Sequence, residues 1–371
     1  MRQAVPSLAD KHLSDYDPSY IGRPRPAIVT FADVAVPQRA TIRVRGAGLP
    51  RNSEHADMPS SMVRAFSDPF EYQQFFRAAD VELVVTERGE YAADLKRMDF
   101  HELWMQRTWQ SLPFVARAHN YKTRVPVVFL ADECQAPIKA AGQELSPGEL
   151  VFPASGDEYH YRTWTEINLA MMSLAPDEFS SAARILLGRE ATAPAVTRFL
   201  RPPPELMSKL MILHKAAADL ASTAPEIFAH PAVSRAMEQA LVGTMIACLA
   251  EEADLVYSAR KRAHTAVIRK FEEVIEASPD TPLYVIDLCR AMGVTDRTLR
   301  LHCHEHLGMS PHRYLWLRRM HLARRSLIRG AAATTVTEIA TSCGFGELGR
   351  FAVSYRKLFG ETPSATLRRH A

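Results

Sequence analysis

One pattern of apolar residues occurs twice near the C-terminal end of the chain, in "LCRAMGVTDRTLRLHCHEHLGMSP" (Leu288–Pro311) and in "IATSCGFGELGRFAVSYRKLFGETP" (Ile339–Pro363). Apolar residues spaced by three and four predict helices, and the glycine inside each copy predicts a turn between two of them. Each copy therefore predicts a helix-turn-helix unit. The matched apolar positions are Leu288, Val294, Leu299, Cys303 and Leu307 in the first copy and Ile339, Phe345, Phe351, Tyr355 and Phe359 in the second.

The residues around the two copies carry helix start and stop patterns. Each copy ends on a glycine followed by Ser310-Pro311 or Thr362-Pro363, which predicts a C-cap and the immediate start of another helix. Thr335 and Glu338 have the spacing of a capping box in front of the second copy. A basic helix over 313–327 joins the units and spans about 22 Å at 1.5 Å per residue. Two helices held in this way could enter successive major-groove faces of DNA.

Charge is distributed unevenly along the chain. Residues 260–371 contain 19 Lys and Arg against ten Asp and Glu, although the whole chain has a net charge of only +3. A basic module is therefore attached to an acidic body. This favours a nucleic-acid partner for the repeat, whereas a helical array used for protein contacts is the alternative interpretation.

The second copy resembles the DNA-binding domain of the AraC/XylS family of transcription regulators. The resemblance rests on Ile339-Ala340, Gly344-Phe345, Phe351, Tyr355 and the closing "LFGETP", and it covers the chain from Pro282 to its end. "GFGELGRF" and "PSATL" are similar to the branch that contains ethanolamine-operon activators. The front of the chain resembles, more loosely, the cupin-like sensor barrel of such regulators. The resemblance implies a transcription regulator, with activation favoured over repression.

Residues that contact DNA are expected on the second helix of each unit and on the helix between the units. The exposed first turns of the second helices should reach base edges, with arginine as the best donor to guanine. Basic groups elsewhere should contact phosphate. The base-reading candidates are Thr295, Arg297, Thr298, Arg300, Glu347 and Arg350, and the phosphate candidates are His304, Arg318, Arg319, Arg356 and Lys357.

The histidine-rich stretch "LRLHCHEHLG" (Leu299–Gly308) has a second interpretation as a zinc site. His302, Glu305 and His306 fall at i, i+3 and i+4, so they could share one helix face. A fourth ligand is not evident. The repeat instead places His302, His304 and His306 on the outer part of the helix, past its first turns. We therefore expect no metal site there, and no cofactor or catalytic residue in the chain.

Four segments are expected along the chain, in an α+β arrangement. Residues 1–65 are rich in proline without a sustained period and predict an irregular arm. Short apolar runs between Gly and Pro turns over 66–180 predict a small β-barrel or sandwich, and the resemblance favours a cupin-like β-barrel. Residues 181–262 predict a helical linker that also dimerises, with "MEQALVGTMIACLAEE" (Met237–Glu252) as its most apolar part. The DNA-binding domain occupies 263–371.

The barrel is expected to hold a small-molecule effector, although the sequence does not assign the residues that bind it. Six bulky or imidazole side chains of the strand-rich region are candidates, but such side chains more often belong to the core. A metal-dependent cupin enzyme fused to the DNA-binding module is the alternative; it would need an HxH pair, and "DEYHYR" offers one histidine. A domain that only dimerises is a third hypothesis. The six candidates are His101, Trp104, Trp109, His160, Tyr161 and Trp164.

The remaining features of the sequence concern partners and location. Five cysteines without a CxxC pair predict reduced, mostly buried thiols. The first residues contain no apolar core of the signal-peptide kind, and no apolar run approaches the roughly 18 residues that a membrane span needs, so we expect neither feature. We therefore expect a cytoplasmic regulator with no membrane partner. Its expected partners are double-stranded DNA, a small-molecule effector, a second copy in a homodimer, and RNA polymerase if it activates.

Overall fold

The structure is a computed structural model that describes residues 59–250, 253–254, 259–277, 283–330 and 334–370. All of these belong to one compact unit that spans 54–371. Most of the predicted N-terminal arm lies outside the described residues, but its last part forms strand β1, so the strand region begins earlier than expected. None of the helices in the described ranges is long and apolar enough to cross a membrane.

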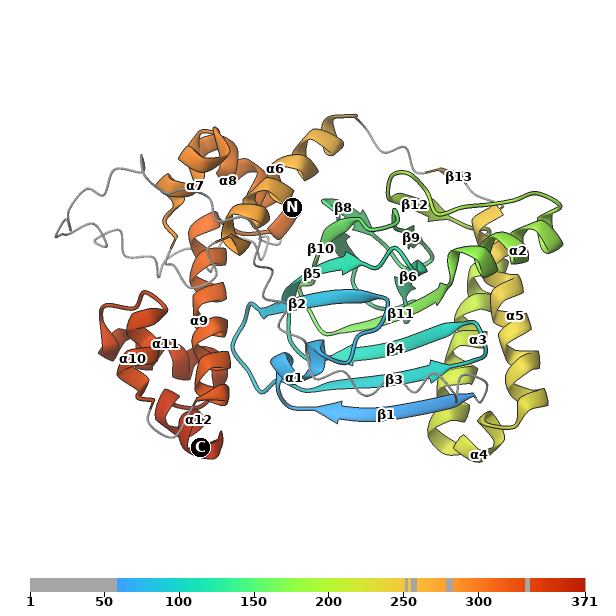
Figure 1. Ribbon diagram of the computed structural model, residues 1–371, viewed down its shortest axis with the longest axis horizontal. Helices are drawn as coiled ribbons and strands as arrows, with labels where there is room; N and C mark the ends of the chain where they lie inside the picture. Colours follow the sequence, from blue (N-terminus) through green and yellow to red (C-terminus); the bar gives the residue numbers. More distant parts are fainter. Residues whose placement is uncertain (1–58, 251–252, 255–258, 278–282, 331–333, 371) are drawn as a thin grey trace, which may run out of the picture. The chain divides into compact units, whose positions relative to one another are not determined.

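The strands form two facing antiparallel sheets (Figure 1). The larger sheet has the order β1-β3-β4-β11-β6-β9-β12-β13, and the smaller has the order β2-β5-β10-β7-β8. The strands therefore do not close into the expected barrel, and the two sheets correspond to the sandwich alternative. The bounds are β1 Ser60–Phe66, β2 Ala79–Val85, β3 Ala93–Asp99, β4 Trp104–Gln110, β5 Phe114–Asn120, β6 Val125–Leu130, β7 Ile138–Ala140, β8 Gln143–Leu145, β9 Leu150–Phe152, β10 Glu158–Arg162, β11 Ile167–Leu174, β12 Arg198–Arg201 and β13 Ala253–Asp254.

The larger sheet is buried on both faces because two cores lie against it. In β6, Val128 and Leu130 belong to the core between the sheets, whereas Val127 and Phe129 belong to the core beneath the helices. Successive side chains of a strand point to opposite faces, so a strand covered on both faces becomes a continuous apolar run. "VPVVFL" is such a run, and every residue in it is buried.

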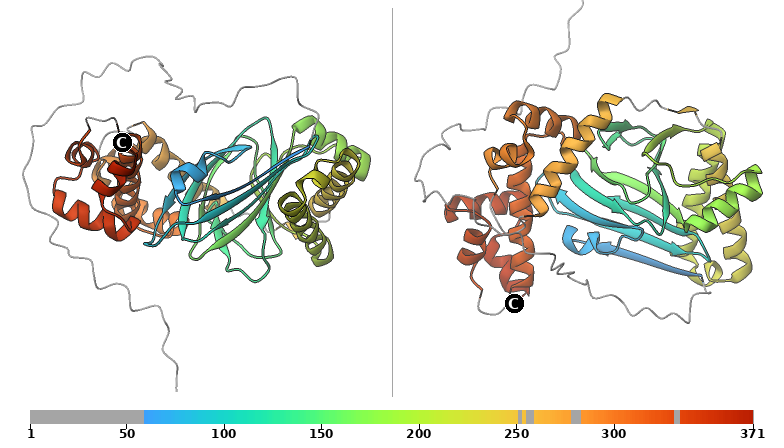
Figure 2. Two further views of the ribbon diagram at one scale, coloured as in Figure 1. Left: turned by 90° about the horizontal axis from the view of Figure 1, so that it is seen from below. Right: turned by 45° about the horizontal axis from the view of Figure 1, so that its top comes forward.

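Helices after the strands cover the outer face of the larger sheet (Figures 1 and 2). Leu241, Met245 and Ile246 of α5 are buried in the same core as Phe129 of the sheet. The apolar side of the predicted dimer helix is therefore used inside the chain, and β12 and β13 place further parts of the predicted linker in the sheet. The helices are α2 Pro176–Leu187, α3 Pro204–Thr223, α4 Pro225–Phe228 and α5 Pro231–Ala250; the short α1 Pro69–Gln73 follows β1.

The C-terminal part of the chain is helical, with two helix pairs where the repeat predicts them (Figure 1). Helix α9 joins the pairs and has 19 residues, longer than the expected helix over 313–327, for a length of about 28 Å. The turns within the pairs place Gly293 at φ 69° and Gly344 at φ 79°, a region that glycine adopts without steric cost. The bounds are α6 Ala259–Glu276, α7 Val285–Met292, α8 Asp296–Leu307, α9 Pro311–Arg329, α10 Val336–Ser342, α11 Leu348–Phe359 and α12 Pro363–His370.

Caps and core positions of the helical part confirm the repeat. Thr335 and Glu338 form the capping box, and Ser310 caps α9 in front of its proline. Cys303 and Tyr355, which occupy matching positions in the two copies, are both fully buried in one core. Burial also raises the pKa of the Cys303 thiol above its ordinary value.

Candidate nucleic-acid interface

The first turns of α8 present polar side chains to solvent. Thr295 is the N-cap, and its hydroxyl oxygen accepts a hydrogen bond from the backbone N–H of Thr298 at 3.1 Å. Thr295, Arg297 and Arg300 are exposed, whereas Leu299 between them is fully buried. The helix period thus places the base-reading candidates on the side opposite to the core, as a recognition helix requires.

The two arginines on α8 differ in their surroundings. Arg300 forms a bidentate pair with Asp296, with Nε 3.0 Å from Oδ1 and Nη2 2.8 Å from Oδ2. Arg297 makes no ion pair with another residue in the part of the chain that the structure describes. Its planar guanidinium therefore keeps its donors available for the O6 and N7 acceptors of guanine. The carboxylate of Asp296 fixes the direction of Arg300.

The start of α11 contains the same kind of pair. Arg350 Nε lies 3.0 Å from Glu347 Oε2, and both side chains are exposed. Gly349 has nothing within 4 Å of the position that a Cβ would occupy, so the open side of this turn can approach another surface closely. Leu348 and Val353 add exposed apolar groups on the same helix. The exposed side of this helix thus carries apolar groups of the kind that contact thymine methyl groups and one arginine of the kind that donates to guanine.

The phosphate candidates fall into two groups by exposure. His304, Arg356 and Lys357 are exposed on α8 and α11. Arg319 is half-buried; it donates from Nη1 to the carbonyl oxygen of Gly344 at 3.4 Å, and its guanidinium lies over the ring of Phe345 at 5.3 Å. Arg319 therefore supports the turn between α10 and α11.

Arg318 is held by two carboxylates. Its Nη2 lies 3.0 Å from both oxygens of Glu82 on β2, and its Nη1 lies 3.4 Å from Oε2 of Glu272 on α6. Glu272 is fully buried, and its Oε1 lies 3.3 Å from Nε2 of His160 on β10. A phosphate contact by Arg318 requires these carboxylates to release it.

The electrostatics of this cluster follow from burial and pairing. Burial alone would raise the pKa of Glu272, but the imidazole of His160 at 3.3 Å and the charge of Arg318 lower it to about 2. Burial alone would lower the pKa of Arg318, yet Glu82 and Glu272 raise it above the ordinary arginine value. Glu272 and Arg318 are therefore both charged at neutral pH, and the cluster of Glu82, His160, Glu272 and Arg318 joins α6 and α9 to the smaller sheet. No local sequence pattern indicates it, because its members are far apart in the chain.

The histidines of α8 differ from the expectation. His302 and His306 are 7% and 4% exposed, so only His304 lies on the outer side. A Cβ on Gly142, in the turn between β7 and β8, would come within 2.4 Å of the His306 ring, which shows how closely the strands cover this face of α8. The zinc hypothesis gains no support, since no group of three or more His, Cys, Asp or Glu side chains in the described ranges could hold a metal ion.

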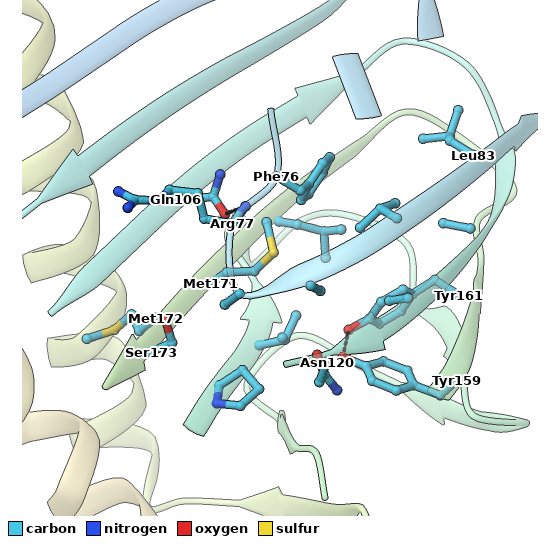
Figure 3. A pocket seen from close by; sticks show the side chains of 18 of the residues that line it. Phe76, Arg77, Leu83, Gln106, Asn120, Tyr159, Tyr161, Met171, Met172 and Ser173 are labelled. Carbon is cyan, nitrogen blue, oxygen red and sulfur yellow. Dashed lines mark hydrogen bonds between the residues drawn. The ribbon is translucent and has the colours of Figure 1, made fainter. Parts of the chain in front are cut away.

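A cavity lies between the two sheets (Figure 3). About 60 Å³ of it is open to the centres of water-sized molecules, and Trp104 and Tyr161 are among its lining residues. The other four effector candidates do not line it. His160 belongs to the Arg318 cluster, Trp164 is 46% exposed, Trp109 donates to Glu166 at 3.3 Å, and His101 pairs with Glu102 at 3.0 Å.

Comparisons with known proteins match the helical part to one family model and the chain to several transcription regulators. Residues 288–369 match the family model described as a helix-turn-helix domain. A probable thc operon regulatory protein from Rhodococcus erythropolis is 39% identical over 150 residues, which are 39% of this chain and 44% of that protein. The XylDLEGF operon transcriptional activator 3 from Pseudomonas putida is 37% identical over 103 residues, which are 27% of this chain and 31% of that protein.

A solved structure is also similar to part of the chain. It is a probable AraC family transcriptional regulator from Rhodopseudomonas palustris, 39% identical, and the match covers 28% of this chain and 97% of that one with a TM-score of 0.27. The chain spans less than half of the length of the two curated relatives above. The family model establishes that residues 288–369 form a helix-turn-helix domain.

Proposed function

We propose that the protein is a sequence-specific DNA-binding transcription regulator, and an activator, that responds to a small molecule bound by its strand domain. The observation that carries the DNA-binding part is the first turn of α8. Thr295, Arg297 and Arg300 are exposed there, while Leu299 and Cys303 of the same helix fill the core. A helix whose polar first turn is exposed beside a rigid core can enter the major groove without unfolding.

In this proposal both helix pairs read DNA, as two helix-turn-helix units. The first pair contributes Arg297 and Arg300 to base edges, and the second contributes Arg350 with Glu347. His304, Arg319, Arg356, Lys357 and, once released by its carboxylates, Arg318 position the units by phosphate contacts. Thr298 completes the base-reading set; it is half-buried, and its hydroxyl bonds to that of Thr295 at 2.8 Å.

The regulatory partners extend the proposal. Two copies of the chain bind as a homodimer, and the activator contacts RNA polymerase. A transcription regulator acts in the compartment that holds the chromosome, and this agrees with the expected cytoplasmic location. The cavity between the sheets is the proposed effector site, because it is enclosed by both sheets and a few polar side chains converge on it. The likeness to ethanolamine-operon activators stays a prediction.

No specific observation favours the cupin-type enzyme. The motif that such an enzyme needs would include His160, and this histidine pairs with Glu272 from α6 instead. Metal analysis of the purified chain remains the direct check. A stoichiometric iron, manganese or zinc ion would support the enzyme.

Mapping of bound DNA in cells tests the regulatory function. The tagged full-length chain is expected to concentrate at a few sites upstream of genes, and a reporter behind such a site is expected to depend on the protein. Arg297→Ala should redistribute the protein among sites, whereas Arg184→Ala, an exposed arginine on α2, should not. Uniform occupancy by the unmodified chain would contradict sequence-specific regulation.

A further inference from the structure

The walls of the cavity are mainly hydrocarbon. The smaller sheet contributes Leu83 and Ala118, and the larger sheet contributes Val128, Leu169 and Met171. Figure 3 shows Met171 and Phe76 on one side and the rings of Tyr159 and Tyr161 on the other. Apolar walls of this kind gain binding free energy from apolar surface and offer little to the many hydroxyls of a sugar.

One end of the cavity presents a polar group without a partner. Asn120, at the end of β5, is 3% exposed; its amide is near enough to the Tyr159 hydroxyl to lower the Tyr159 pKa, but its Nδ2 has no acceptor in hydrogen-bonding geometry among the described residues. The hydroxyl groups of Tyr159 and Tyr161 lie beside it and bond to each other at 2.6 Å (Figure 3). A buried donor without an acceptor is unfavourable, so an acceptor oxygen brought by a ligand would be stabilised there.

This polar end carries no charge. Burial raises the pKa of Tyr159 to about 12, although Tyr161 and Asn120 act in the opposite direction, and burial raises that of Tyr161 further. The two hydroxyls therefore stay neutral at physiological pH. Neutral donors suit a carbonyl oxygen, whereas a carboxylate would lose its hydration without gaining a cation.

The charged group at the other end is already neutralised. Arg77 is the single charged residue that lines the cavity, and its Nη1 lies 2.6 Å from Oδ1 of Asp99. Its guanidinium also lies over the ring of Trp104 at 3.8 Å. An anionic ligand would have to compete with Asp99 for this arginine. A cationic ligand would find no carboxylate among the lining residues.

From this geometry we infer that the cavity binds a neutral, mainly apolar molecule with one carbonyl-type acceptor oxygen, which accepts a hydrogen bond from Nδ2 of Asn120. The ring or chain of the ligand lies between the two sheets, and its oxygen points to the end formed by Asn120 and Tyr159. This inference rests on the proposed effector function and assigns the effector a chemical class. Sugars, amines and simple carboxylates fall outside that class.

Four probes of similar shape test the class: 1-acetonaphthone, 1-ethylnaphthalene, 1-naphthoate and 1-naphthylmethylammonium. Titration calorimetry on the full-length chain should show the ketone binding at least tenfold more tightly than either ion. Ala118→Phe, which places a ring in the cavity, should abolish binding of the ketone. Tighter binding of the naphthoate or the ammonium ion, or no binding of the ketone, would overturn the inference.

A pair of variants tests the hydrogen bond. Asn120→Leu should weaken binding of the ketone about fivefold, which is the usual net value of one hydrogen bond. It should leave the dissociation constant of 1-ethylnaphthalene within about twofold of the unmodified chain. The matched control is Asn168→Leu on β11, which does not line the cavity and should change neither probe. Equal loss of both probes in Asn120→Leu would mean a structural role only and would overturn the assignment.

DNA binding by the same preparations separates this inference from the proposed function. If the chain retains a preferred DNA sequence but the ketone does not bind, the ligand class is wrong and the DNA-binding function stands. If the ketone binds as expected but no DNA sequence is preferred, the ligand class stands and the regulatory function is wrong.

Discussion

Removal of Arg318 should reveal a buried charge cluster that stabilises the chain. Arg318→Met keeps the length of the side chain but leaves Glu272, which is fully buried, with His160 as its remaining partner in the cluster. Glu82 is 30% exposed and keeps a weaker pair with Arg117 at 3.8 Å. The cost therefore falls mainly on Glu272.

The expected magnitude follows from the burial of that carboxylate. Removing one partner of a buried pair typically costs about 3–5 kcal/mol, because the remaining charge is left uncompensated. The Arg318 side chain is 16% exposed, so we expect the low end, about 3 kcal/mol. Glu272→Gln removes the charge that would be stranded, and the double variant should therefore recover at least about 1 kcal/mol relative to the sum of the single variants.

Urea unfolding of the four proteins, followed by circular dichroism and tryptophan fluorescence, measures this coupling. Arg356→Met is the control, because Arg356 is exposed on α11 and its loss should change the unfolding free energy by less than about 0.5 kcal/mol. A loss below about 1 kcal/mol for Arg318→Met, or single effects that simply add, would refute the reasoning about the cluster.

Three further outcomes can be measured. The pKa of Glu272 is lowered from 4.5 to about 2, so its charge stabilises the fold fully above pH 4.5. In urea unfolding, the unfolding free energy of the unmodified chain relative to Glu272→Gln should therefore fall by roughly 2 kcal/mol from pH 5 to pH 3. A difference that stays constant with pH would contradict the pKa shift. Arg297→Ala should relax the preference at one base position, whereas Lys357→Ala should weaken binding to all duplexes alike and lower the slope of log binding constant against log salt concentration by about 1. If Arg297→Ala weakened binding to every duplex equally in a titration, Arg297 would leave the base-reading set. Thr335→Ala should cost about 1 kcal/mol in thermal unfolding through its lost N-cap, and an equal loss in the exposed control Thr337→Ala would argue against the cap.

The helical part could be predicted in detail because its determinants are local. The spacing of apolar residues, the turn glycines and the caps act within a few residues of one another, so they appear directly in the sequence. Cys303 and Tyr355 were placed in the core by the repeat alone, and both are fully buried. The base-reading and phosphate assignments remain predictions, since they depend on bound DNA.

The misplaced residues are those whose surroundings come from distant parts of the chain. His302 and His306 are buried because the strands cover one face of α8, and the repeat contains no information about that covering. Likewise, Glu272 and His160 are 112 positions apart, and only the folded chain brings them within 3.3 Å. The apolar side of α5 predicted a dimer surface because its true partner, the larger sheet, could not be identified from the sequence.

The strand domain was predictable in kind but not in topology. Short apolar runs and turn residues indicated several strands, and the structure contains them. The pairing of β4 with β11 joins residues about 60 positions apart, and such long-range pairing decides whether strands close into one barrel or form two sheets. The cavity results from this pairing, so its lining could not be listed from sequence beyond Trp104 and Tyr161.

Selection of bound duplexes from a random DNA library tests the central claim most directly, with the full-length chain and two variants. We predict two preferred clusters of bases about ten base pairs apart, one read by each helix pair. Arg297→Ala should relax the preference at a base position in one cluster only, and Arg350→Ala should relax it at a position in the other cluster only. An absence of preferred sequence, or a single cluster affected by both variants, would contradict two DNA-reading units in this chain.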